Sequence, residues 1–66
     1  MEIILNGQSY QLPKNIQSVQ QLLEHLTLSE RVVIVEVNRE IVPKEEYQRA
    51  IHERDEIEMI HFVGGG

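Results

Sequence analysis

The chain ends with IEMIHFVGGG, residues 57–66, an apolar stretch that leads into three consecutive glycines. Apolar and polar side chains alternate at its start, and apolar residues dominate up to Val63, which is typical of a central β-strand with both faces partly covered. Glycine has no Cβ, so it adopts backbone angles closed to other residues and lets the walls of a second protein come close. The stretch therefore predicts a firmly held strand that presents a narrow tail, residues 64–66.

The glycines also allow a simpler interpretation. Glycine-rich segments are typical flexible linkers, and a linker remnant or an expression artefact has the same composition. Composition alone does not separate a working tail from such a remnant, so the choice depends on the rest of the chain.

Length and composition predict one small domain. A chain of 66 residues buries only about 60% of its unfolded surface, which leaves one small core and no room for a deep active site. Apolar residues make up 41% of the chain and charged residues 26%. Because the apolar residues recur at regular periods, we expect a folded domain over residues 1–63, followed by a flexible tail over 64–66.

Charge and cysteine content exclude several classes of function. The net charge is −5, from 11 acidic and 6 basic residues without a basic cluster, which disfavours nucleic acid and favours partners with a basic surface. Without cysteine the chain has no disulfide, thiolate metal site, nucleophilic thiol or persulfide. No apolar run reaches membrane-spanning length and no signal peptide is evident, so we expect a cytoplasmic protein with no membrane partner.

The N-terminal residues predict a β-hairpin. Two strand-like stretches, residues 2–6 and 8–12, meet at Asn6-Gly7, a pair that favours the positive φ angles of a type I′ turn. Pro13 then ends the pairing, because proline has no N–H to donate to a neighbouring strand.

A single helix follows the hairpin. Ser18 is expected to cap its N-terminus, with Gln21 three residues later completing a capping box. The apolar positions recur at i, i+3, i+4 and i+7 and form one stripe: Val19, Leu22, Leu23 and Leu26.

Residues 31–38 contain the β-branched run VVIVEV and predict a third strand. Glu36 marks its outer face, so alternation directs Val33, Val35 and Val37 toward the helix.

Residues 38–40 predict a turn. Residues 41–43 then predict an extended edge segment, and Pro43 is expected at the first position of one helical turn that ends at residue 46. Tyr47 and Ile51 are expected to pack beneath the sheet, and residues 53–56 to form a polar turn before the last strand.

This order of elements predicts an α+β fold of the β-grasp type. A hairpin pairs antiparallel, whereas a helical crossover joins strands that are not hairpin neighbours, so the sheet is mixed. We expect four to five strands with one helix packed on one face. The first and last strands would lie side by side and parallel at the middle of the sheet.

Several of these features together resemble the ubiquitin-like sulfur carriers, most closely the ThiS family of thiamin thiazole biosynthesis. They are the Asn-Gly hairpin, the capped helix, the Val-rich strand and the terminal Gly-Gly. The resemblance covers the whole chain and rests on VVIVEVN (residues 32–38), IVP (41–43) and IHFVGGG (60–66). Where the family requires two terminal glycines, this chain has a third, Gly64, before Gly65 and Gly66.

The resemblance implies that the Gly66 carboxylate is the working group. A ThiF-like adenylating enzyme would join it to AMP from ATP, and a sulfur donor such as a cysteine desulfurase would convert the adenylate into a thiocarboxylate. A ThiG-like thiazole synthase would then accept the sulfur, with Gly65 and Gly64 threading through the partners' channels. The chain would be a protein co-substrate and no enzyme, monomeric when free, with no cofactor or metal of its own.

The remaining polar side chains predict no catalytic or metal site. His25, His52 and His61 are scattered, with no second ligand at metal spacing. The acidic stretches at residues 45–46 and 53–56 are expected to be solvated turns. The serines have no neighbouring base and acid.

The outer face of the predicted sheet is more informative. If Glu58 faces solvent, alternation places Ile60 and Phe62 beside it, next to Val32 and Ile34 of the third strand. An exposed apolar patch of this kind usually marks a contact site, although a strand register shifted by one residue would bury the same side chains. We expect these four residues to bind a partner.

Two alternatives to thiazole synthesis stay open. The same tail chemistry serves molybdopterin synthesis, transfer RNA thiolation or protein conjugation. The chain could instead be a β-grasp binding module whose glycines are only a flexible end.

Overall fold

The computed structural model describes residues 1–62 and begins with a β-hairpin, β1 (Glu2–Leu5) and β2 (Gln8–Gln11). The turn between them has positive φ at both central residues, 49° at Asn6 and 82° at Gly7. Positive φ at both positions is the requirement of a type I′ turn, so the predicted hairpin is confirmed.

Helix α1 (Val19–His25) follows, capped by Ser18, whose Oγ accepts a hydrogen bond from Gln21 N at 3.1 Å. Gln21 Oε1 accepts in turn from Gln17 N at 2.7 Å, whereas a capping box would use the N–H of the cap residue. The Gln21 side chain therefore bonds the N–H of the residue before the cap, and not that of Ser18 as predicted. The backbone around Ser18 is extended and forms a bridge with Ala50, which sets the direction in which the chain enters the helix.

The C-terminal half contains β3 (Val33–Val37), β4 (Glu40–Ile41), the 3₁₀ helix η1 (Lys44–Glu46) and β5 (Glu56–His61). The prediction for Pro43 was wrong by one position. Its ψ of 160° is extended, and η1 begins only after it. The hydrogen bond from Val42 N to Val35 O, 2.8 Å, keeps the chain aligned along β3 up to that point.

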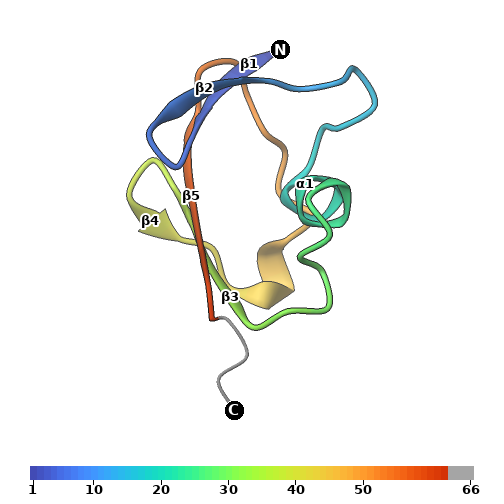
Figure 1. Ribbon diagram of the computed structural model, residues 1–66, viewed down its shortest axis with the longest axis vertical. Coiled ribbons are helices and arrows are strands. Elements are labelled where there is room, and N and C mark those ends of the chain that lie inside the picture. Colours follow the sequence, from blue (N-terminus) through green and yellow to red (C-terminus); the bar gives the residue numbers. More distant parts are fainter. Residues whose placement is uncertain (63–66) are drawn as a thin grey trace.

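The strands form one mixed sheet of order β2-β1-β5-β3-β4, with α1 on one side (Figure 1). Its parallel pair joins β1 to β5, with Ile4 opposite Glu56 and Leu5 opposite Ile57. The last strand, β5, thus lies at the middle of the sheet and parallel to the first strand, as predicted. The β-grasp prediction is confirmed. The boundary predicted after residue 63 lies outside the described residues.

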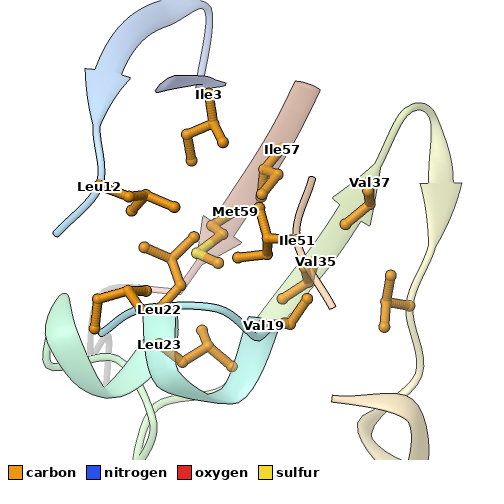
Figure 2. Packing of buried hydrophobic residues seen from close by; sticks show 12 residues of the cluster. Ile3, Leu12, Val19, Leu22, Leu23, Val35, Val37, Ile51, Ile57 and Met59 are labelled. Atoms are coloured by element: carbon orange, nitrogen blue, oxygen red, sulfur yellow. The ribbon is translucent and has the colours of Figure 1, made fainter. Parts of the chain in front are cut away.

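The core fills the space between α1 and the inner face of the sheet, where side chains from both layers converge (Figure 2). Val35, Val37 and Ile51 are buried there as predicted, and Tyr47 and Val33 are partly buried. The buried apolar residues are Ile3, Leu12, Ile16, Val19, Leu22, Leu23, Val35, Val37, Val42, Ile51, Ile57 and Met59. Burying apolar area is the main stabilising contribution in so small a domain.

Candidate functional site

The strand that leads to the C-terminal glycines is held on both sides. β5 pairs with β1 on one edge and with β3 on the other over five positions, from Val37 opposite Ile57 to Val33 opposite His61. The pairing extends one residue further, because Phe62 N donates to Val32 O at 3.3 Å. The predicted working residues Gly64, Gly65 and Gly66 lie outside the described part of the chain, so they stay predictions.

Two asparagines fix the position of β5, one from each neighbouring turn. The Asn6 side chain bonds both backbone groups of Met59. Asn38 Oδ1 accepts from Glu56 N at 2.9 Å, and Asn38 Nδ2 donates to Asp55 Oδ1 at 3.0 Å. Neither contact was predicted. The available signal was an asparagine at each turn, a residue type that tolerates positive φ and bonds nearby backbone.

The predicted apolar patch exists on the outer face of the sheet. Ile34 of β3 lies directly opposite Ile60 of β5, and Val32 bonds Phe62 through the backbone. The exposed fractions are 74% for Val32, 40% for Ile34, 47% for Ile60 and 60% for Phe62. Strand alternation was therefore assigned correctly, and the patch lies at the end of β5 that leads to residues 63–66.

Ile41 extends this surface and was not predicted as part of it. It is 68% exposed and lies opposite Glu36 of β3, so it shares the outer face. The sequence alone could not place it, because the register of a two-residue strand depends on the turn that precedes it.

The same face becomes acidic toward the other end of β5. Glu36 and Glu58 lie directly opposite each other, an arrangement that is unfavourable between like charges. No Lys or Arg of residues 1–62 forms an ion pair with either carboxylate. A partner with a basic side chain beside an apolar surface would complement this face.

The polar side chains of residues 1–62 form no metal-binding cluster. Within residues 1–62 no three His, Cys, Asp or Glu side chains converge as metal ligands, and no helix there is long and apolar enough to cross a membrane. One expectation about the acidic turns was wrong. Asp55 is 9% exposed, because its carboxylate accepts from Asn38 Nδ2 and from His52 N and so stabilises the turn before β5.

Comparison with known proteins identifies the family. The sequence profile of the ThiS family matches residues 3–66. Sulfur carrier protein ThiS of Bacillus subtilis is 44% identical over 63 residues, which cover 94% of this chain and 96% of that protein. The crystal structure of the thiamine biosynthesis protein ThiS from Geobacter metallireducens has a TM-score of 0.82 at 28% identity, with both chains fully covered.

A third relative is a much larger protein. Thiazole synthase of Paramagnetospirillum magneticum is 39% identical over 67 aligned positions, which cover this whole chain and 20% of that protein. On the fold, the family match and these similarities together, the chain belongs to the ThiS family, the sulfur carriers of thiamine biosynthesis.

Proposed function

We propose that this ThiS-family sulfur carrier holds its sulfur as a thiocarboxylate at Gly66. The observation that carries the proposal is the position of the glycines in the sequence, separated from the end of β5 by two residues, in a chain that has no cysteine. A carrier without thiols needs another group on which to bind sulfur. The terminal carboxylate is the group that its neighbouring glycines leave sterically accessible.

The chemistry requires activation by a partner enzyme. A carboxylate is a poor electrophile, so a ThiF-like enzyme joins the Gly66 carboxylate to the α-phosphate of ATP and releases pyrophosphate. A sulfur donor such as a cysteine desulfurase supplies a persulfide, whose terminal sulfur displaces AMP and forms an acyl disulfide. A second thiol on the donor or the activating enzyme then cleaves this disulfide, which leaves the thiocarboxylate on Gly66 and a new disulfide between the thiols. The partner binds ATP, and this chain acts as the protein co-substrate. Because the activation consumes ATP, we propose that the chain is activated in the cytoplasm.

We further propose a thiazole synthase as the acceptor. The support is the thiazole synthase of Paramagnetospirillum magneticum, in which a stretch similar to this whole chain makes up 20% of one polypeptide. If a carrier-like stretch and a synthase form one polypeptide in one organism, the corresponding separate proteins of another organism are expected to bind each other.

The outer face of the sheet is the proposed docking surface for these partners. Val32, Ile34, Ile60 and Phe62 expose contiguous apolar area, which on a small protein usually marks an interface. The patch lies where β5 leads into the tail, so docking there would bring Gly66 close to a partner's active site.

Pyrophosphate exchange tests the activation step. Intact chain and purified activating enzyme should exchange labelled pyrophosphate into ATP, and the chain lacking Gly66 should not, because its carboxylate is displaced by one residue from the α-phosphate. Equal exchange by both chains would contradict the assignment of Gly66.

A further inference from the structure

A groove of about 380 Å³ runs beside the edge of β3 that faces away from β5. Residues 31–35 line one side. Ile41, Pro43, Lys44 and Tyr47 line the opposite side. Nothing in the proposed sulfur chemistry uses this groove.

The peptide groups of β3 point alternately toward β5 and into the groove. Val32 O accepts from Phe62 N, and Ile34 lies two residues further along the same ladder, so both face β5. The peptide groups of Val33 and Val35 therefore face the groove. Val35 O accepts from Val42 N, but within residues 1–62 the N–H of Val35 and both backbone groups of Val33 have no hydrogen-bond partner.

β4 is too short to cover this edge. It pairs with β3 at Glu36 and Val37, and the same register would bring Lys44 opposite Val33. Pro43 has no N–H, however, and at Lys44 the chain turns into η1. Val42 still lies opposite Val35, so the free edge begins at Val33. Its two backbone groups are a template onto which another extended segment can pair.

Two cations lie beside the free edge. Arg31 and Lys44 line the groove and are two of only six basic residues in a chain of net charge −5. Neither has a carboxylate of residues 1–62 within ion-pair distance. The apolar side chains of Ile41 and Tyr47 complete the lining. The groove thus combines free backbone groups, apolar walls and positive charge.

We propose that the free edge of β3 binds an extended acidic segment of a partner protein, which pairs with both backbone groups of Val33. Backbone hydrogen bonds would supply affinity, and alternate apolar side chains of the segment would contact Ile41 and Tyr47. Its carboxylates would lie near Arg31 and Lys44, and this charge complementarity selects the partner. The site adjoins the apolar patch through Val32 and Ile34, but it does not depend on Gly66 or on sulfur transfer.

Amide hydrogen exchange followed by NMR tests the free edge. In the dilute chain the amide proton of Val33 should exchange rapidly, while that of Ile34, paired with β5, should exchange slowly. Slow exchange at both positions would overturn the proposal, because the edge would then be closed. Exchange at Val33 that slows as the protein concentration rises would also overturn it, since a second copy of the chain would then be the occupant.

A synthetic peptide tests the occupant. A seven-residue peptide of alternating valine and glutamate should slow exchange at Val33 about tenfold or more and leave Ile34 unchanged. The same peptide with N-methylated backbone amides should fail to do so. Equal binding of a peptide of alternating valine and lysine would contradict the role given to the cations.

Charge reversal provides a matched pair of variants. Lys44→Glu should weaken binding of the valine–glutamate peptide about tenfold, because an attraction near the groove becomes a repulsion. Lys14→Glu changes the net charge equally but lies in the loop before α1, outside the groove, so it should change affinity less than about twofold. Equal losses in the two variants would contradict a local role for Lys44.

Discussion

The side chain of Asn6 binds both backbone groups of Met59, 53 residues further along the chain. Asn6 Oδ1 accepts from Met59 N at 2.8 Å, and Asn6 Nδ2 donates to Met59 O at 3.4 Å. The residue that makes the first turn thus also continues the ladder between β1 and β5. The strand leading to the C-terminal glycines is held in place by the hairpin at the start of the chain.

Asn6→Ala should lower the free energy of unfolding by about 2 kcal/mol, because it leaves Met59 without these partners and puts alanine at a positive φ. Asn15→Ala, at an exposed loop position, should cost less than about 0.5 kcal/mol. Urea unfolding of both variants measures the difference. Equal stability would show that the Asn6–Met59 contact contributes nothing.

Arg39→Gly should stabilise the domain. Arg39 has a φ of 72° in the turn between β3 and β4, a conformation that costs about 1 kcal/mol for a residue with a Cβ and little for glycine. Arg39→Ala removes the same side-chain atoms but keeps the Cβ, so it separates the backbone effect from loss of the guanidinium. The glycine variant should melt several degrees above the alanine variant, and the reverse order would contradict the strain assigned to this turn.

A buried and an exposed isoleucine of β5 should respond differently to substitution. Ile57→Ala should cost about 3 kcal/mol because Ile57 is fully buried. Ile60→Ser should cost less than about 1 kcal/mol, because Ile60 is exposed, yet it should weaken binding to the activating enzyme or the thiazole synthase at least about tenfold. Gln11→Ser on β2 is the binding control. Thermal melts and surface plasmon resonance check both effects, and unchanged affinity of Ile60→Ser would exclude the patch as a docking surface.

Much of this fold was predictable, because local signals and the tertiary structure agree. Asn6-Gly7 determined the first turn, the cap at Ser18 determined the start of α1, and alternation along β3 and β5 gave the face on which Ile34 and Ile60 lie. The apolar patch followed from that alternation alone.

The missed features depend on contacts between distant segments. The sequence predicts a solvated turn residue at Asp55. Its burial depends on Asn38, 17 residues earlier, whose side chain donates a hydrogen bond to it. The extended backbone at Pro43 follows from a hydrogen bond of Val42 to β3, and the free edge of β3 follows from the early end of β4. Thiamine synthesis was predicted only from the resemblance to the ThiS family, which the comparison with known proteins confirmed, since the β-grasp fold alone does not specify the sulfur acceptor.

Gly65→Ala should separate stability from function. The added methyl group follows the last strand, so the melting temperature should change by less than about 2 °C. Pyrophosphate exchange with the activating enzyme should fall strongly, because a Cβ obstructs a channel that fits bare backbone. Full exchange activity would show that the tail does not pass through a narrow channel.

Intact-mass spectrometry of the chain, purified from cells with an active thiamine pathway, tests the central claim most directly. We predict a second species, heavier by the difference between one sulfur and one oxygen atom, with the extra mass on the C-terminal peptide that contains Gly66. The species should disappear in the chain lacking Gly66. Sulfur found only on another peptide, or no sulfur-bearing species at all, would contradict the assignment of the Gly66 carboxylate as the carrier group.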